Sequence, residues 1–275
     1  MKDKISIITY TYNNEDIVLK SINSVLNQTF NNIELIIIDN HSSDNTYKII
    51  KKIKDNRLKV IRLRKKIDNK YLYNLALKEI SGKYINFLNI NNLYRFDKLD
   101  KQLNNIVNND SDIDICKSII HNDNITILNN NIFNELNNNN LINLDCLLIR
   151  KSIISRIKFD EELDSLEDLD YILRISNHKI SYSNEILIDI YKDKEISNKK
   201  DIIRIIKKDY KIDDNNKDIL ENYLLRNLYD NKLNNLLIKY NDLNNKYLDK
   251  EKELNNITNN KKFKFINKII KVIRK

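Results

Sequence analysis

The sequence predicts an α/β fold in which a mostly parallel sheet is flanked by helices, with a helical extension at its C-terminal end. Three observations support this prediction. The first 90 residues alternate between short apolar runs and apolar residues at helical spacing. The run "IELIIID" at 33–39 is apolar on both faces, as a central parallel strand is. From about residue 196 onward the pattern is helical and polar. Strand–helix alternation implies right-handed connections between parallel strands.

The expected elements follow this order along the chain. Strands are expected at 4–9, 33–39, 57–63, 84–88, 112–120, 144–150 and 185–191, and helical spacing is present over 18–26, 47–53, 72–80, 95–107 and 165–176. Ser43 is expected to cap the second helix. Residues 129–140 form a variable loop or a weak helix. A boundary is placed near residue 195, which gives a domain at 1–195 and a helical region at 196–275.

The composition is that of a soluble globular protein, with 41% hydrophobic and 32% charged residues among 275. Because the chain has one glycine and no proline, Asn and Asp must make most of its turns. Two cysteines do not suggest a disulfide framework, and we find neither a signal peptide nor an apolar run long enough to cross a bilayer. A cytoplasmic protein is therefore expected.

The net charge of +9 is concentrated at the C-terminal end of the sequence. Residues 261–275, "KKFKFINKIIKVIRK", hold seven basic and no acidic residues, so the rest of the chain is nearly neutral. Apolar residues at helical spacing within this basic tail predict an interfacial helix that binds an anionic membrane surface. The alternative is a helix that packs within a C-terminal bundle. Nucleic acid is not an expected partner, because the body of the chain has no basic stripe.

Four stretches, taken in order, resemble GT-A glycosyltransferases of family 2. They are "ISIITYTYNNE" (5–15), "LNQTFNNIELIIIDNHSSDNT" (26–46), "GKYINFLNINN" (82–92) and "LEDLDYILRI" (166–175). The resemblance implies an inverting glycosyltransferase that moves a sugar from a nucleotide-diphosphate sugar to a hydroxyl of a glycan or lipid-linked saccharide. Such an enzyme would act in polysaccharide biosynthesis at the inner face of the membrane. Two alternatives are a degenerate domain that binds a nucleotide sugar or a partner enzyme, and a structural membrane-associated protein.

The resemblance assigns donor binding to the turns after the first two strands. It implies that Tyr12 and Asn13 hold the nucleotide base and that Asp39 accepts a hydrogen bond from the base. Asn40 stands where relatives have a second acid. The alternative interpretations are that Asn13 caps a helix beginning at Glu15, and that Asp39 closes a strand-to-helix turn.

The resemblance also places a divalent cation, Mg²⁺ or Mn²⁺, at the end of the strand in "FLNINN". Relatives have Asp-x-Asp there, whereas this chain has Asn89 and Asn91. Each replacement keeps an oxygen ligand but removes a negative charge, so metal binding should be weak or absent. Leaving-group charge would then be neutralised by basic side chains such as Arg64, Lys65 or Lys70.

The acidic helix at 165–176 contains the catalytic candidates. The resemblance implies that Asp168, next to Glu167, acts as the general base that deprotonates the acceptor hydroxyl. The alternative is structural, because Ser165 and Asp168 have the spacing of a capping box and acids favour a helix N-terminus.

Overall fold

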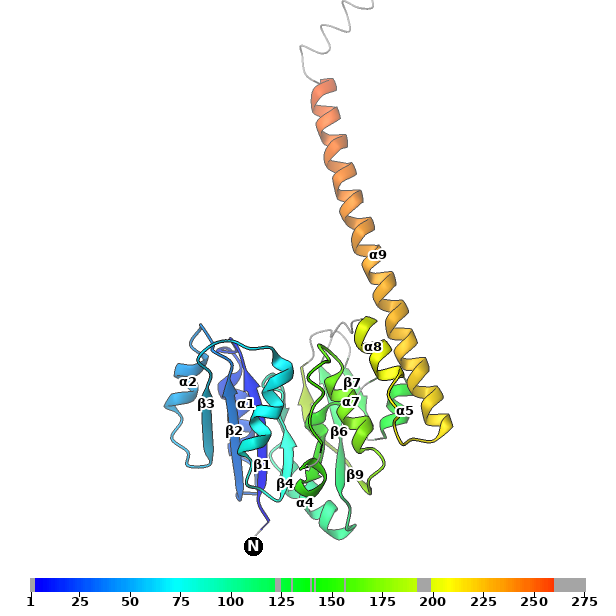
Figure 1. The fold of residues 1–275 in the computed structure, drawn as a ribbon. Coiled ribbons are helices and arrows are strands. Elements are labelled where there is room, and N and C mark those ends of the chain that lie inside the picture. The colour runs from blue at the N-terminus through cyan, green and yellow to red at the C-terminus, as the bar shows by residue number, and fades with distance from the viewer. Residues whose placement is uncertain are drawn as a thin grey trace, which may run out of the picture. The chain divides into compact units, whose positions relative to one another are not determined.

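A computed structural model describes most of the chain (Figure 1). The described residues are 3–121, 125–129, 131–138, 140, 142–155, 157–191 and 199–259. The basic tail at 261–275 lies outside them, so its predicted membrane helix stays a prediction. A compact unit comprises Met1–Leu225, and Arg226–Lys275 forms a second unit. The boundary expected near residue 195 likewise stays a prediction.

The first four strands form the parallel half of the sheet. They are β1 (Ile5–Thr11), β2 (Ile33–Asp39), β3 (Leu58–Arg62) and β4 (Tyr84–Phe87), in the spatial order β3-β2-β1-β4. The side chains of β4 are all buried, and so are those of β2 except Glu34. Gly82 precedes β4, where a Cβ atom would lie 2.6 Å from Ser6 Oγ. The lone glycine therefore stands where two backbones approach closely.

The second half of the sheet is mixed. It contains β8 (Leu147–Arg150), β6 (Ile113–His121), β9 (Ile180–Ile190) and β5 (Leu93–Tyr94), in this spatial order after β4, with β7 (Ile125–Leu128) paired to β6. Strand β8 is antiparallel to both β4 and β6, whereas β9 is parallel to β6. The mostly parallel α/β sheet is confirmed. The short strands β5 and β7 were not expected.

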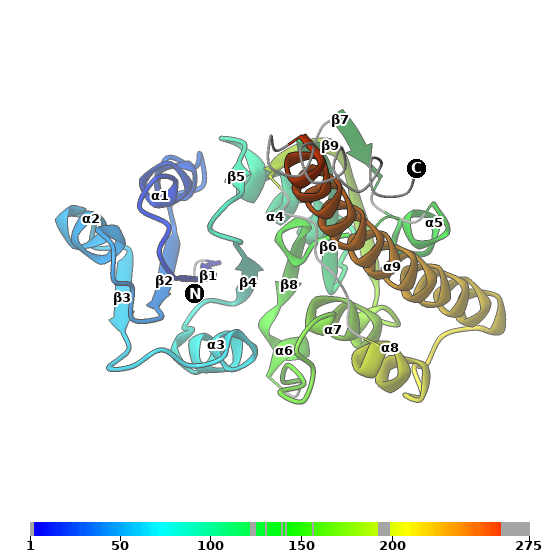
Figure 2. The same cartoon turned by 90° about the horizontal axis from the view of Figure 1, so that it is seen from above.

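Helices cover both faces of the sheet, and Figure 2 shows α1 and α3 on opposite faces. The α-helices are α1 (Val18–Leu26), α2 (Thr46–Lys52), α3 (Leu72–Ala76), α4 (Lys98–Asn108), α5 (Ile132–Asn137), α6 (Lys151–Ile154), α7 (Glu167–Ile175), α8 (Lys199–Ile206) and α9 (Asp214–Asn259). Short 3₁₀ turns occupy Asn69–Tyr71, Leu77–Glu79 and Leu144–Cys146. The helical C-terminal extension is thus present, and none of the helices within the described ranges is long and apolar enough to cross a membrane.

Three features at helix N-termini differ from interpretations that the sequence offered. Helix α1 begins at Val18, as its helical spacing predicts, and not at Glu15, where Asn13 could have capped it. Helix α2 has Asn45 at its N-cap, and Asp44 Oδ1 accepts the Thr46 N–H at 2.9 Å, so the prediction of a Ser43 cap was wrong. The turn before α2 is also joined to the turn after β1, because a Glu15 carboxylate oxygen accepts the Asn45 N–H at 2.8 Å, and spacing within the sequence does not reveal such a partner.

The third difference lies at α7. Its N-cap is Leu166, which has a left-handed φ of 62° and makes no side-chain cap hydrogen bond. The Ser165 hydroxyl donates to Asp201 Oδ2 at 2.8 Å, and Leu166 rather than Ser165 occupies the N-cap position. A positive φ at a leucine costs conformational energy and is common at functional sites.

Candidate functional site

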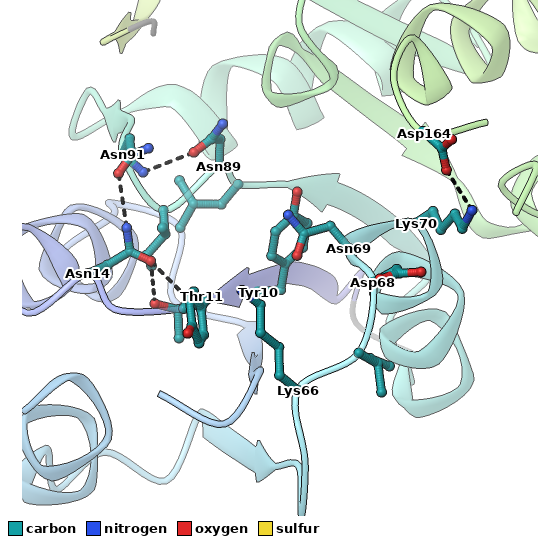
Figure 3. Close-up of a pocket in the computed structure, with 14 residues that line it drawn as sticks. Tyr10, Thr11, Asn14, Lys66, Asp68, Asn69, Lys70, Asn89, Asn91 and Asp164 are labelled. Carbon is teal, nitrogen blue, oxygen red and sulfur yellow. Dashed lines mark hydrogen bonds and ion pairs between the residues drawn. The ribbon is translucent and has the colours of Figure 1, made fainter. Parts of the chain in front are cut away.

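A pocket of about 550 Å³ opens at the carboxyl ends of β1 and β4 (Figure 3). Its lining residues are Tyr10, Thr11, Tyr12, Asn14, Lys66, Ile67, Asp68, Asn69, Lys70, Leu88, Asn89, Ile90, Asn91 and Asp164. This is the edge of a parallel sheet at which ligands bind in open α/β folds. The pocket has an aromatic side, an amide side and two lysines.

Tyr12 provides the exposed aromatic surface of the pocket. Tyr12 is 36% exposed, and Lys66 Nζ lies 3.7 Å from the centroid of the Tyr12 ring. Asn14 holds the turn beneath it, since Asn14 Oδ1 accepts from Thr11 Oγ1 at 2.8 Å and from the Tyr12 N–H at 2.9 Å. The predicted base-binding tyrosine therefore stands on a fixed turn. Lys66 and Asn14 were not predicted from the sequence.

Asn13 joins the turn after β1 to the turn after β2. It has a φ of 54°, a conformation that Asn tolerates better than most residues. Its Oδ1 accepts the Ser43 N–H at 2.9 Å, and its own N–H donates to Ser42 Oγ at 3.1 Å. The side chain thus braces the two turns rather than capping a helix, and it does not line the pocket.

Asp39 is fully buried at the end of β2, behind the pocket wall. Its Oδ1 accepts the Ser42 N–H at 3.4 Å, and its Oδ2 lies 3.3 Å from Arg62 Nε. That contact does not have the geometry of a hydrogen bond, and Oδ2 accepts none from the described residues. Asp39 therefore keeps acceptor capacity at the sheet edge.

Asn40 is buried and fixes the loop that forms one side of the pocket. Its Nδ2 donates to the Ile67 carbonyl at 2.8 Å, and its Oδ1 accepts the Ile67 N–H at 3.0 Å. Its own N–H donates to the Thr11 carbonyl at 2.9 Å. The amide thus ties β1 to the loop that contains Lys66 and Lys70.

Lys70 and Asp164 form an ion pair at one end of the pocket (Figure 3). Lys70 Nζ lies 2.6 Å from Asp164 Oδ1, and this hydrogen bond raises the pKa of Lys70. The backbone N–H groups of Asp164 and Ser165 donate to Asp201 Oδ2, on α8, at 3.0 and 2.7 Å. Helix α8 therefore positions the backbone of Asp164. Of the three basic residues expected near the site, Lys70 lines the pocket, whereas Arg64 and Lys65 do not.

Asn89 and Asn91 line the pocket opposite the lysine loop. Asn89 Oδ1 accepts the Asn91 N–H at 3.0 Å, and Asn91 Oδ1 accepts from Asn14 Nδ2 at 3.4 Å. The Asn89 N–H donates to Asp145 Oδ2 at 2.8 Å. Asp145 is a buried carboxylate that the sequence did not identify, and burial raises its pKa even though the Asn92 amide and the Asn89 N–H stabilise its charge. Within the described part of the chain, His, Cys, Asp and Glu form no cluster of three that suits a metal ion.

Glu167 and Asp168 occupy the first turn of α7 and are half-buried. Neither lines the pocket, but both follow the pocket residue Asp164 closely in the chain. Burial raises the pKa of Tyr73, and the charge of Asp168 raises it further, so Asp168 lies near this tyrosine. The Tyr73 ring centroid is 5.1 Å from that of Tyr10, which lines the pocket. The acids are thus close to the pocket wall.

The sequence model of the family described as Glycosyl transferase family 2 matches residues 6–161. The chain belongs to glycosyl transferase family 2. Escherichia coli UDP-Glc:alpha-D-GlcNAc-diphosphoundecaprenol beta-1,3-glucosyltransferase WfaP is 38% identical over 105 residues, which cover 36% of this chain and 39% of that relative. Staphylococcus aureus poly(ribitol-phosphate) beta-N-acetylglucosaminyltransferase TarP is 30% identical over 221 residues, covering 71% of this chain and 65% of TarP.

Solved glycosyltransferases have the same fold as this family 2 chain. S. aureus TarS in complex with UDP-GlcNAc superposes with a TM-score of 0.68 at 20% identity, over 82% of this chain and 73% of TarS. The Pyrobaculum calidifontis mannosyltransferase PcManGT, in complex with GDP-Man and Mn²⁺, gives a TM-score of 0.61 at 13% identity, over 88% and 81% of the two chains. These similarities establish the GT-A fold, and PcManGT, which has that fold, binds Mn²⁺.

Proposed function

We propose that this chain transfers a sugar from a nucleotide-diphosphate sugar to a hydroxyl group, with inversion at the anomeric carbon. The observation that supports this most strongly is the pocket, where the Tyr12 ring, Lys66 and Lys70 line one cavity at the ligand edge of the sheet. An aromatic face suits a nucleotide base, and two ammonium groups suit a diphosphate. The family and its named transferases support the same chemistry.

The proposed donor is a uridine-diphosphate sugar. Asp39 Oδ2 has acceptor capacity at the end of β2, and a carboxylate is the right partner for the imide N–H of uracil. Tyr12 would then stack on the base, and Asn13 and Asn40 would hold the turns that form the base site. Solved complexes of TarS with UDP and with UDP-GlcNAc support this choice of nucleotide.

The proposed base is Asp168, with Glu167 beside it at the start of α7. The acceptor oxygen attacks the anomeric carbon as the bond from that carbon to the diphosphate oxygen breaks on the opposite side. The hydroxyl proton passes to the Asp168 carboxylate, and the nucleoside diphosphate leaves. The left-handed Leu166 immediately before these acids supports a functional role for the turn, because strain of this kind accumulates at active sites.

The proposed acceptor is a glycan or a lipid-linked saccharide. One relative is named for a diphosphoundecaprenol-linked GlcNAc and another for poly(ribitol-phosphate). Such acceptors would meet the enzyme at the cytoplasmic face of a membrane, and the basic tail at 261–275 would hold it there as a peripheral protein.

A second candidate function is a degenerate domain that binds a nucleotide sugar, or a partner enzyme, without turnover. The specific observation that favours it is the pair of amides, Asn89 and Asn91, at the position where the resemblance places metal-binding acids. The two functions differ in turnover rather than in donor binding.

A screen of UDP-, GDP- and dTDP-sugars tests the proposal, with binding measured by calorimetry and nucleotide release measured separately. We expect at least one UDP-sugar to bind and to release UDP slowly in water. Binding without release from any donor, even when saccharide and lipid-linked acceptors are added, would favour the degenerate domain. Failure of every nucleotide sugar to bind would contradict the transferase and would leave only a degenerate domain that binds a partner enzyme.

A further inference from the structure

We infer that Lys66 and Lys70 supply the counter-charge for the donor diphosphate, so that the pocket binds a nucleotide diphosphate without a divalent cation. This inference rests on the proposed function, because it concerns how that donor is held. It also assigns a role to the loop at 63–70, which forms one side of the pocket opposite Asn89 and Asn91.

The amide side of the pocket does not fit a divalent cation. The Asn89 and Asn91 side chains are neutral, and their Oδ1 atoms already accept hydrogen bonds from the Asn91 N–H and from Asn14 Nδ2. The nearby carboxylate, Asp145, is buried behind the wall, and its Oδ2 accepts the Asn89 N–H. A cation bound there would be held mainly by neutral oxygens that already share one lone pair with an N–H donor. Mg²⁺ and Mn²⁺ prefer sites with carboxylates, so neutral ligands of this kind bind them weakly.

The two lysines provide positive charge, which the neutral amides do not. Lys66 extends from the loop into the pocket (Figure 3). Its ammonium lies over the ring of Tyr12, 3.7 Å from the ring centroid. A cation–π contact at an exposed ring is weak compared with a charge-assisted hydrogen bond to phosphate. A diphosphate can therefore draw Lys66 from the ring, and the ring is then free to stack on the base.

Lys70 can exchange one anionic partner for another. Its side chain is only 18% exposed, whereas that of its partner Asp164 is 54% exposed. The Lys70 ammonium attracts an arriving phosphate at short range, and the exposed carboxylate of Asp164 can turn into solvent at little cost. Without ligand, the ion pair keeps Lys70 charged and fixed beside the pocket. Asp164 therefore competes with the diphosphate for Lys70.

Calorimetry of UDP and UMP in EDTA tests the inference on the full chain. The variants are Lys66→Gln, Lys70→Gln and Asp164→Asn. Lys65→Gln is the matched control, because Lys65 is an exposed lysine of the same loop that does not line the pocket. We expect wild type to bind UDP about tenfold more tightly than UMP, as a charge-assisted contact to the second phosphate implies. The Lys66 and Lys70 variants should lose most of this ratio, Lys65→Gln should keep it, and Asp164→Asn should raise UDP affinity.

The possible results separate this inference from the proposed function. UDP binding that appears only after Mn²⁺ is added would overturn the lysine inference and leave the transferase proposal standing. An unchanged UDP-to-UMP ratio in folded Lys66→Gln and Lys70→Gln would also overturn it. If Lys70→Gln fails to fold, Lys66→Gln and Asp164→Asn still decide the question. Absence of binding by any nucleotide, with or without metal, would contradict both proposals.

Discussion

The side-chain amide of Asn40 forms two hydrogen bonds with the backbone of Ile67, donating to its carbonyl at 2.8 Å and accepting its N–H at 3.0 Å. Asn40 follows β2, and Ile67 lies in the loop that contains Lys66 and Lys70. One buried amide therefore sets the distance between the ligand edge of the sheet and both pocket lysines. An aspartate at this position would accept the N–H but could not donate to the carbonyl.

Asn40→Ala should loosen the lysine loop. We expect UDP affinity to fall about tenfold and the free energy of unfolding to fall by about 1–2 kcal/mol, because the two polar groups of Ile67 lose their partner. Calorimetry and urea denaturation measure these two quantities. Asn31→Ala, at an exposed asparagine, is the control and should change neither. Wild-type UDP affinity in folded Asn40→Ala would show that the two Asn40–Ile67 hydrogen bonds do not position the loop for binding.

Asp168→Asn separates the catalytic interpretation of α7 from the structural one. If Asp168 is the base, the variant should lose nearly all transfer while UDP affinity and the melting temperature stay close to wild type. If the carboxylate only favours the helix N-terminus, its loss should cost less than about 1 kcal/mol of stability and leave turnover intact. Glu167→Gln is the neighbouring control, and we expect it to retain more activity than Asp168→Asn.

The parallel half of the sheet was predictable because its strands are continuous apolar runs, as in β2 and β4, that end in polar residues. Because the carboxyl ends of parallel strands meet at one edge, the strand ends alone indicated that Asp39 and Asn89 share an edge, whereas their roles and that of Tyr12 came from the family resemblance. The insertion of β8 between β4 and β6 was not predictable, because it depends on antiparallel pairing between strands distant in sequence.

The supporting contacts of the site were hidden from the sequence for the same reason. The Asn40–Ile67 clamp joins residues 27 positions apart, and the contacts of Asp201 with Asp164 and Ser165 join an acid of α8 to a loop more than 30 positions away. Nothing in local composition marks either pair. Lys66 was missed because an exposed lysine in a basic loop has no signal that distinguishes it from Lys65.

Asp160 should make stability depend on pH in the acid range. Burial alone would raise its pKa, but hydrogen bonds from Lys208, the Glu162 N–H and Arg204 outweigh burial and lower the pKa from 3.8 to about 2. A folded-state pKa below the unfolded value stabilises the protein above pH 3.8, and this stabilisation is lost as the pH falls towards 2. The side chain is 16% exposed, and the shift corresponds to about 2 kcal/mol at neutral pH.

Urea denaturation at pH 7 and at pH 3 measures this contribution. Asp160→Asn should lose about 2 kcal/mol of unfolding free energy at pH 7 and clearly less at pH 3, because at pH 3 the carboxyl of the unfolded chain is mostly protonated while that of the folded chain is still mostly ionised. Asp213→Asn, at an exposed acid whose hydrogen bonds are local, is the control. An equal loss at both pH values would mean that Asp160 acts through packing rather than through its charge.

Removal of residues 261–275 tests the predicted membrane contact of the basic tail. The shortened chain should stay folded and no longer co-sediment with anionic vesicles. Binding by the full chain should weaken as salt is added, because the attraction between lysines and anionic lipid is screened. Equal binding of the full chain to neutral and anionic vesicles would contradict this electrostatic account.

The most direct test of a lysine-based glycosyltransferase is the rate of UDP release from the donor identified in the screen, measured in EDTA and in Mn²⁺. We expect EDTA to lower the rate by less than about twofold, since the ligands at Asn89 and Asn91 are neutral and Lys66 and Lys70 supply the positive charge. An enzyme that stops completely in EDTA and recovers when Mn²⁺ is added would contradict the account.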